Sequence, residues 1–386
     1  MIRLYNFIGH LLTPWAERHL QQRCQRGKED PLRFQEKLGR GSAGQGPVDV
    51  WIHAASIGEL NAARPIIAGL NEENIRVLVT TATLSSAQMA ASWLPDCLHR
   101  FAPLDLPSAR KRFFHQWKPQ CLITIDSEIW PGWLYQAQKQ NIKVMMFNAR
   151  LSPKSCRRWT SLRPFVGKIL RHVAVIHAQD VASAKIFSLL GSKQVKVTAP
   201  LKLALLPKHA EQNVKRDRFV FLSMHPEERD VIMKLRDHIR HHQISMDIWM
   251  IPRHPDRLNE FGKLPSDILV EKQFGQVSKH LAQAKAVLVG GSFFPHGGQN
   301  PLEPLMFGVR PIVGPFMHNF TGIVTLMREQ KAIIQVEDIE QAADKLLDTY
   351  QQDQKSPDIT PIIAHLRHLG NQSVADALHA VKGVLL

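Results

Sequence analysis

The sequence has 386 residues, of which 44% are hydrophobic and 22% charged, the composition of a globular chain long enough for two domains. Its formal net charge of +15 indicates a negative partner such as anionic lipid, nucleic acid or a phosphorylated substrate. The four cysteines lack the spacing of a metal site or disulfide framework, which favours a reducing compartment, and no apolar run approaches the roughly 20 residues that span a bilayer.

The first segment, residues 1–30, combines an apolar helical stripe with a basic end. The apolar side chains recur at helical spacing from Ile2 to Trp15, and the basic residues that follow are Arg18, Arg23, Arg26 and Lys28. Such a helix can lie in the interface of an anionic membrane. It can equally pack on the protein itself, and the sequence leaves both interpretations open.

From about residue 48, short apolar runs alternate with longer amphipathic segments. The strands expected in the first half are Val48–His53, Ile75–Thr80, Leu122–Asp126, Val144–Asn148 and Val173–Ala178. This alternation predicts a parallel sheet covered by helices on both faces, in a Rossmann-like domain over residues 31–205. The pattern breaks near residues 195–202, and we interpret the polar segment 207–218 as a linker.

The alternation resumes after the linker and predicts a second Rossmann-like domain over residues 206–386. The expected strands are Phe219–Ser223, Asp247–Pro252, Ile268–Val270, Ala286–Val289, Pro311–Val313 and Ala332–Val336. The fold class is therefore α/β, with two doubly wound domains facing across a cleft. In such sheets ligands bind beyond the carboxyl ends of the strands.

Polar side chains follow several of these strands. In the first domain the candidate residues at these positions are Ser56, Gly58, Glu59, Glu128 and Arg150. A carboxylate placed there is suited to act as a general base on a substrate hydroxyl. Each has a structural alternative: Glu59 can cap its own helix, and Glu128 can pair with Arg150.

The second domain supplies Arg253 and a glycine loop, which we define as residues 290–300. The loop contains Gly291 and Ser292, and Asn300 and Glu303 are expected to begin the next helix. Backbone N–H groups at such a turn can hold a phosphate. The alternative is an ordinary connection whose Glu303 completes a capping box.

These segments together resemble the 3-deoxy-D-manno-octulosonic acid (Kdo) transferases. The resemblance is carried, in order, by residues 53–59, 127–131, 148–152, 252–255, 290–303 and 314–320. It implies a GT-B glycosyltransferase that transfers Kdo from CMP-Kdo to a lipid A precursor (lipid IVA), with inversion and without a metal or other cofactor. It also implies peripheral or monotopic attachment to the cytoplasmic side of the inner membrane, in lipopolysaccharide biosynthesis.

The resemblance also assigns roles to the residues that match its motifs. Glu59 becomes the general base and Glu128 its neighbour in the same catalytic pocket, where Ser56, Gly58 and Arg150 bind substrate. The CMP part falls to the second domain, with Arg253 and the loop N–H groups stabilising the departing phosphate. Its residues are Arg253, Gly291, Ser292, Asn300 and Glu303.

The chain departs from the family pattern at three places. The junction reads Ala199-Pro-Leu-Lys202, a Tyr-Gly-Glu-like piece reads Phe274-Gly-Gln276, and the loop Ser223-Met-His-Pro-Glu-Glu228 lacks the glycine expected before its last glutamate. Two alternatives follow: a divergent transferase for another nucleotide sugar or acceptor, or a catalytically degenerate relative that binds lipid or a partner. Nucleic acid is not expected as a partner, because no motif for binding it accompanies the charge.

Overall fold

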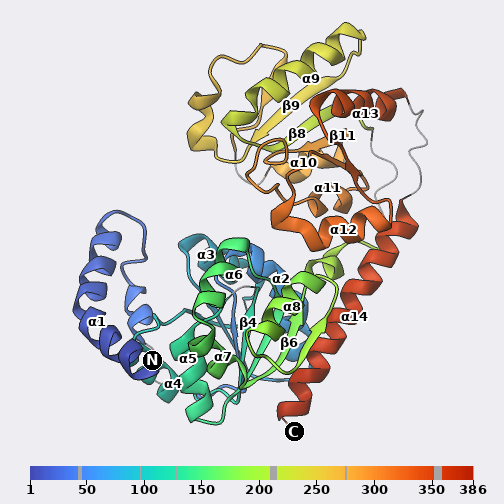
Figure 1. Cartoon of the computed structure of the whole chain (residues 1–386). Coiled ribbons are helices and arrows are strands. Elements are labelled where there is room, and N and C mark those ends of the chain that lie inside the picture. The colour runs from blue at the N-terminus through green and yellow to red at the C-terminus, as the bar shows by residue number, and fades with distance from the viewer. Residues whose placement is uncertain are drawn as a thin grey trace. The chain divides into compact units, whose positions relative to one another are not determined.

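The computed structural model describes residues 1–41, 46–95, 97–126, 128–208, 215–273, 276–351 and 359–385. By their internal contacts the residues form two units. The first contains Met1–Ala204 together with Gly370–Leu386, and the second contains Leu205–Leu369. Each unit carries one parallel sheet with helices packed against it (Figure 1).

The sheet of the first unit has the strand order β3-β2-β1-β4-β5-β6-β7, and all of its pairs are parallel. The bounds are Val50–His53 (β1), Val77–Thr81 (β2), Leu98–Phe101 (β3), Cys121–Ile125 (β4), Lys143–Ala149 (β5), Val173–Ala178 (β6) and Val195–Val197 (β7). The five strands expected in this half of the chain are confirmed, with small shifts at their ends.

The two additional strands, β3 and β7, form the edges of this sheet. Edge strands are covered less completely than central ones, so their sequences need not be apolar runs. β3 contains His99 and Arg100, and β7 contains Lys196. The prediction that the pattern breaks near residues 195–202 is therefore wrong, because this segment contains β7 and the start of a 3-10 helix.

Alternating side chains of β1 supply cores on both faces of the sheet. Trp51 packs with Phe113 and Trp133, which lie on helices of one layer. Val50 and Ile52 point to the other face and pack with α2 and α14. The helices of this unit are Ile2–Gln25 (α1), Phe34–Leu38 (η1), Ile57–Glu72 (α2), Leu84–Trp93 (α3), Pro107–Trp117 (α4), Pro131–Lys139 (α5), Pro153–Ser161 (α6), Arg163–Leu170 (α7), Val181–Leu189 (α8), Leu201–Leu205 (η2) and, in its second part, Thr360–Leu385 (α14).

The sheet of the second unit is also parallel, with the order β10-β9-β8-β11-β12-β13. Its strands are Arg218–Met224 (β8), Asp247–Pro252 (β9), Ile268–Val270 (β10), Ala284–Val289 (β11), Pro311–Val313 (β12) and Ile334–Gln335 (β13), and every expected strand is present. The helices are Pro226–Glu228 (η3), Arg229–His241 (α9), Pro255–Phe261 (η4), Val277–Ala282 (α10), Leu302–Met306 (α11), His318–Phe320 (η5), Thr321–Glu329 (α12) and Ile339–Gln351 (α13).

The last helix changes the expected domain organisation. The sequence assigns all of residues 206–386 to the second domain, whereas Gly370–Leu386 belongs to the first unit. Ala377 and Val381 of α14 are fully buried in the same core cluster as Val50. The chain thus returns to the first unit after completing the second.

Both sheets reverse their strand order at a defined point. In the first unit the order runs outward from the β1–β4 pair, and in the second from the β8–β11 pair. Such switch points leave a crevice beyond the carboxyl ends of the two strands, where ligands of doubly wound folds bind. The topology therefore directs attention to the residues that follow β1 and β4, and to those that follow β8 and β11.

Candidate functional site

The segment after β1 places Glu59 at the switch point of the first unit. Ser56 is the N-cap of α2, and its hydroxyl accepts a hydrogen bond from the Glu59 N–H at 3.3 Å. Glu59 Oε2 in turn accepts the Ala55 N–H at 2.7 Å, and Oε1 accepts the Ser56 hydroxyl at 3.2 Å. These hydrogen bonds cap the first turn of α2, as the structural alternative for Glu59 expects. They also fix the carboxylate beside the end of β1.

The electrostatic surroundings distinguish Glu59 from a simple capping residue. Burial raises its pKa most, and the negative charges of Asp126 and Glu128 raise it further, against the hydrogen bonds from Ala55 and Ser56. The resulting pKa is about 8, compared with an ordinary 4.5. A carboxyl group with a pKa near neutrality can exchange a proton with a substrate hydroxyl.

Glu128, after β4, has the opposite environment. Its Oε2 accepts a hydrogen bond from the indole N–H of Trp130 and lies 3.6 Å from Nε2 of the buried His53, just beyond hydrogen-bond distance. Burial alone would raise the pKa of Glu128, but these two contacts outweigh burial and hold it below its ordinary value. Two neighbouring carboxyls whose pKa values move apart are suited to different roles, one exchanging a proton and the other staying ionised.

Asp126 is close enough to both carboxylates to influence them electrostatically, and it adopts an unusual backbone conformation. Its φ is +59°, and Asn148 at the end of the neighbouring β5 has φ +58°. The Asn148 amide donates a hydrogen bond to Asp126, and its Oδ1 accepts the N–H of Leu201 at 3.1 Å. Left-handed residues other than glycine at strand ends are costly and are concentrated at functional sites. The pKa of Asp126 is raised by burial, against the positive charges of Lys202 and Arg150 and the Asn148 bond.

Lys202 brings a positive charge to the start of α2. A Cβ atom at Gly58 would lie 3.5 Å from Lys202 Nζ, so the absent side chain of Gly58 keeps space beside the ammonium group. A cation at a helix N-terminus is electrostatically unfavourable, and the acidic side chain of Asp126 offsets this cost. An anionic ligand would offset it in the same way.

The glycine loop of the second unit differs from the expected phosphate cradle. The Glu228 carboxylate accepts the N–H groups of Gly291 at 2.7 Å, Ser292 at 3.2 Å and Phe293 at 3.3 Å, and that of His225 at 3.1 Å. The expectation that these loop amides hold the departing phosphate therefore does not fit this arrangement. An internal carboxylate already occupies the position of an anion.

Ser292 is also engaged within the loop. Its side chain is fully buried, its hydroxyl donates to the Val289 carbonyl, and the same oxygen accepts the Gly314 N–H at 2.9 Å. This bonding explains why a serine follows the two glycines, since the hydroxyl joins β11 to the segment after β12. The predicted contact between Ser292 and substrate is not supported by this geometry.

The other predicted residues of the second unit lie near the loop. Asn300 Oδ1 accepts the Leu302 N–H at 3.2 Å, and its amide donates to Glu303 at 3.1 Å. The helix nevertheless begins at Leu302 with Pro301 as its N-cap, so the prediction that Asn300 caps it is wrong by one residue. Arg253 follows β9; its backbone N–H bonds to the Met224 carbonyl, and its side chain is exposed. Their assignment to CMP stays a prediction.

Three residues of these sites were not among the sequence candidates: Asp126, Lys202 and Glu228. Asp126 is the last residue of a predicted strand, and Lys202 is the last residue of the segment 195–202, where the sequence analysis ends the strand pattern. Their polarity at strand ends was the available signal. The contacts of Glu228 join segments more than 60 residues apart, and no local pattern indicates them.

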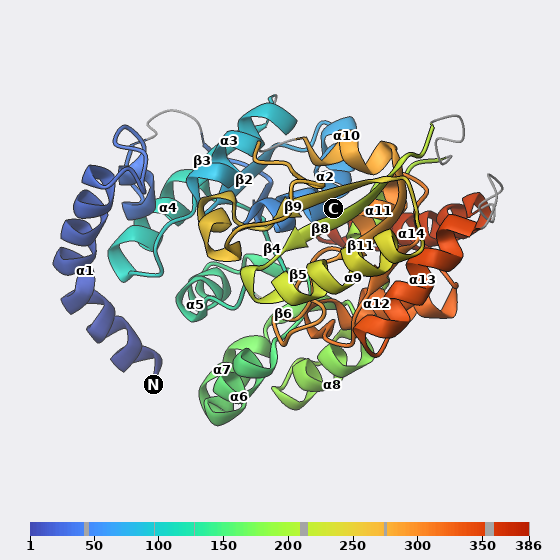
Figure 2. The same ribbon diagram turned by 90° about the horizontal axis from the view of Figure 1, so that it is seen from above.

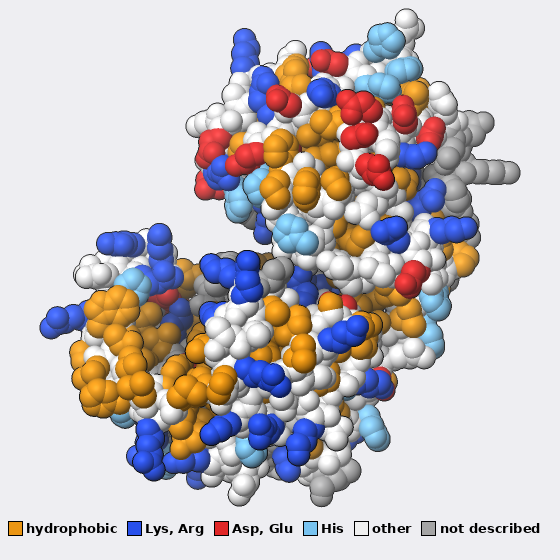
Figure 3. Space-filling model, viewed as in Figure 1, with side chains coloured by type: hydrophobic (Ala, Val, Ile, Leu, Met, Phe, Trp, Pro, Cys, Tyr) orange, Lys and Arg blue, Asp and Glu red, His pale blue; other side chains and the backbone are white. Residues whose placement is uncertain are grey.

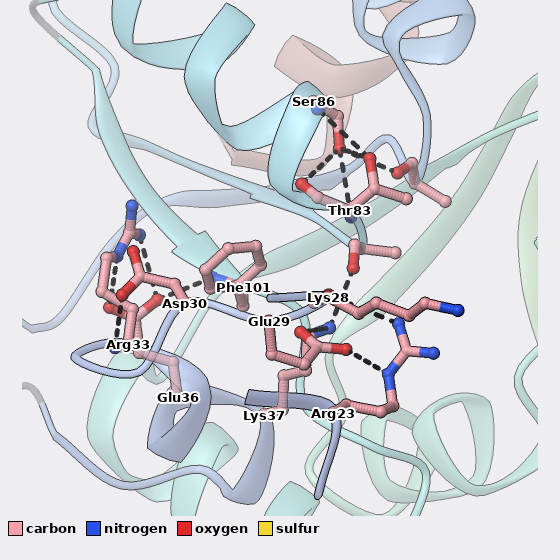
Figure 4. Close-up of polar contacts among 12 residues, drawn as sticks. Arg23, Lys28, Glu29, Asp30, Arg33, Glu36, Lys37, Thr83, Ser86 and Phe101 are labelled. Carbon is pink, nitrogen blue, oxygen red and sulfur yellow. Dashed lines mark hydrogen bonds and ion pairs between the residues drawn. The ribbon is translucent and has the colours of Figure 1, made fainter. Parts of the chain in front are cut away.

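Helix α1 lies against α4 at the outer side of the first unit (Figures 1 and 2). The Tyr5 hydroxyl donates to Asp105 at 2.7 Å, and a Cβ at Gly9 would come within 2.7 Å of Pro107, so the helices approach closely. Beyond its end, the buried Glu29 accepts from Arg23 at 2.8 Å and from Lys37 at 2.5 Å (Figure 4). One face of α1 is thus fixed to the protein.

The opposite face of α1 is apolar and exposed (Figure 3). The exposed side chains are Met1, Leu4, Phe7, Ile8, Leu11, Leu12 and Trp15, with Leu11 at 65%. Of the described helices, none is long and apolar enough to cross a membrane. The interpretation that α1 packs on the protein is therefore confirmed, and the membrane interpretation stays a prediction, since α1 also presents an exposed apolar face.

Comparison with known proteins identifies the family. The family model for 3-deoxy-D-manno-octulosonic-acid transferase (kdotransferase) matches residues 32–205. The 3-deoxy-D-manno-octulosonic acid transferase of Rickettsia bellii is 30% identical over 378 residues, covering 90% of each chain. The chain belongs to the Kdo transferase family. The Haemophilus influenzae transferase is 28% identical, covering 78% of this chain and 80% of its own.

The fold of this Kdo transferase is shared more widely. A glycosyltransferase from Rickettsia africae superposes with a TM-score of 0.60 at 14% identity, covering 89% of this chain and 99% of its own. At this identity the likeness shows the fold alone. It confirms the expected GT-B architecture, and the family membership confirms a glycosyltransferase.

Proposed function

We propose that this Kdo transferase moves Kdo from CMP-Kdo to a lipid A precursor such as lipid IVA, with inversion at the anomeric carbon. The observation that carries the proposal is the environment of Glu59, whose pKa is raised to about 8 beside the ionised Glu128. A base of this kind is what the transfer of a sugar to a hydroxyl group requires.

The reaction is a single displacement in which Glu59 is the base. The ionised Glu59 takes the proton of the acceptor hydroxyl while the acceptor oxygen bonds to the anomeric carbon of Kdo. The bond from that carbon to the CMP phosphate oxygen breaks, and CMP departs with the electron pair. Attack opposite the departing phosphate inverts the configuration.

The remaining predicted residues bind the two substrates. Arg150 and Lys202, whose charges lower the pKa of Asp126, stabilise the anionic groups of sugar or acceptor in the first unit, next to Ser56 and Gly58. Arg253, Asn300 and Glu303 hold CMP in the second unit. Gly291 contributes the turn that brings the glycine loop under Glu228, with φ +66°.

The acceptor is a lipid, and the surface of α1 suits it. We place the exposed apolar face of α1 in the interface of the inner membrane, on its cytoplasmic side. The ring of Tyr5 lies 6.0 Å from that of Phe165, so α1 runs beside α7. Helix α6 and the start of α7 form a basic segment. Its exposed basic side chains are Lys154, Arg157, Arg158 and Arg163, which suit anionic lipid headgroups.

A transfer assay tests this proposal. Purified protein is incubated with CMP-Kdo and a tetra-acylated, bisphosphorylated lipid acceptor, and the lipid is analysed by mass spectrometry. We expect acceptor carrying added Kdo, and release of CMP in equal amount. Folded protein that binds CMP but forms no product would instead support the degenerate binding relative, and transfer only from another nucleotide sugar would support the divergent transferase.

A further inference from the structure

Two histidines and a glutamate gather at the switch point of the second unit. His225 follows β8, Glu227 lies in η3, and His296 belongs to the glycine-loop connection after β11. One ligand atom from each lies within 4.8 Å of the other two. The rings of His225 and His296 are stacked, with centroids 4.5 Å apart, and His296 Nε2 lies 3.6 Å from Glu227 Oε2.

These distances are close to those of a metal site. A tetrahedral zinc ion with bonds of about 2.0–2.1 Å to nitrogen and oxygen sets its ligand atoms about 3.3 Å apart. The His296–Glu227 pair is already near this spacing. Both side chains are partly exposed, at 34% and 43%, so they have room for the small rotations that would bring all three atoms to one ion.

The ring of His225 already has a polar neighbour within the glycine loop. Its Nε2 lies 3.0 Å from the side-chain nitrogen of Gln299, and a metal ion bound at this nitrogen would replace that contact.

Glu227 is not explained by the transfer reaction. Glu227 stands where the family pattern expects a glycine, so it is not one of the residues that the resemblance assigns to CMP or Kdo. The neighbouring Glu228 already satisfies the loop amides, and Glu227 takes no part in those bonds. Its described partners are Arg257 and His296 on the surface.

We propose that His225, Glu227 and His296 form a binding site for Zn²⁺, with at least one coordination position left to water or another ligand. Nitrogen and carboxylate donors in this ratio match the ligand sets of zinc sites that keep an open position. His254, whose ring centroid lies 6.0 Å from that of His225, is a nearby further nitrogen donor. The sequence does not reveal the site because its ligands come from two separate loops.

The surface of α9 offers a competing explanation for any zinc binding. His238 and His242 lie one turn apart with ring centroids 4.4 Å apart, and His241 is next to them. Histidines at this spacing on a helix can hold a metal adventitiously. The variant of the exposed His242 is therefore the matched control, because His242 lies at the opposite end of α9 from His225 and Glu227.

The test measures Zn²⁺ binding to the full chain by competition with a chromophoric chelator. We expect His296→Ala and Glu227→Gln each to weaken the site at least about tenfold, since each removes one of three ligands. His242→Ala should leave this affinity unchanged. The two variants alter partly exposed side chains, and their thermal unfolding should match that of the parent protein.

Unchanged zinc affinity in His296→Ala, or loss of binding only in His242→Ala, would overturn the proposal. The measurement uses neither CMP-Kdo nor lipid. A failed transfer assay would therefore leave the zinc site standing, and a failed zinc titration would leave the transferase proposal standing.

Discussion

Glu228 Oε2 lies 2.7 Å from the backbone nitrogen of Gly291, in the position where a bound anion would accept the same N–H group. The carboxylate takes four backbone donors in all, from His225, Gly291, Ser292 and Phe293. It is buried, and burial raises its pKa against these hydrogen bonds. The glycine loop thus depends for its shape on an anion supplied by the protein itself.

Glu228→Ala should destabilise the protein by about 2–4 kcal/mol, because it leaves several buried donors without an acceptor. Formate or acetate should restore part of this loss by entering the vacated position, whereas chloride at equal ionic strength should not. Thermal unfolding with and without each salt measures both effects.

Glu260→Ala is the control for this change. Glu260 pairs with Arg257 at the surface, and exposed pairs contribute little to stability because water and salt screen them. A Glu228→Ala protein as stable as the Glu260→Ala protein would show that the four hydrogen bonds do not hold the loop.

Glu59→Gln should reduce the transfer rate at least about 100-fold while leaving CMP affinity nearly unchanged, because glutamine cannot accept the proton of the acceptor hydroxyl. Glu72→Gln, at an exposed position near the end of the same helix, is the matched control and should retain activity. Turnover close to that of the parent enzyme after Glu59→Gln would rule out the base assignment.

The free energy of unfolding should depend on pH because of the same carboxyl group. The folded-state pKa of Glu59, about 8, lies above its ordinary 4.5, so the folded protein binds the proton more tightly than the unfolded chain. The resulting stability is complete below pH 4.5 and is lost as pH rises to 8. We expect Glu59→Gln to be more stable than the parent protein at pH 9, by up to a few kcal/mol, with a gap that closes toward pH 5. Urea unfolding at both pH values measures this, and an equal gap at both would contradict the raised pKa.

Local sequence patterns were sufficient to predict the position of Glu59. A strand ending in His53, followed by an acid in the first turn of the next helix, forms a short-range signal, and the structure places both accordingly. The same kind of pattern predicts a helix start at Asn300, and the helix begins nearby, at Leu302 with Pro301 as its N-cap. Interactions of this kind are encoded within a single turn, so they can be derived without a fold.

Tertiary relationships were beyond the sequence argument. Glu228 fills the glycine loop from a different strand end, and the last part of α14 returns to the first unit to bury Ala377. Neither contact produces a periodic pattern in the sequence. The strands β3 and β7 were missed for a related reason, because edge strands carry polar residues that hide them.

Asp126→Asn should shift the acidic limb of the pH–rate profile toward lower pH by about one unit. After burial, the charge of Asp126 is the largest cause of the raised pKa of Glu59, so removing this charge makes Glu59 easier to ionise. Asparagine tolerates the left-handed backbone at this position, and its amide oxygen can still accept from Asn148. If the pH midpoint of the acidic limb of kcat/KM is unchanged, the charge of Asp126 does not raise the pKa of Glu59.

Replacing Leu11 and Trp15 together by glutamate should abolish binding to anionic vesicles. Burial of either side chain in the membrane interface contributes roughly 1.5–3 kcal/mol of transfer free energy. The pair therefore accounts for a factor of about 100 or more in the partitioning of the protein onto vesicles. Both side chains are over 60% exposed and lie on the face of α1 opposite Gly9, so folding should be unaffected. Replacing Gln21 and Gln22 by glutamate adds the same charge to the same helix beyond its last exposed apolar residue, Trp15, and this control should retain most of the binding. Flotation with vesicles containing phosphatidylglycerol, at low and high salt, separates the two contributions, because salt weakens only the electrostatic one. Equal flotation of the two variants would show that charge alone brings the protein to the membrane.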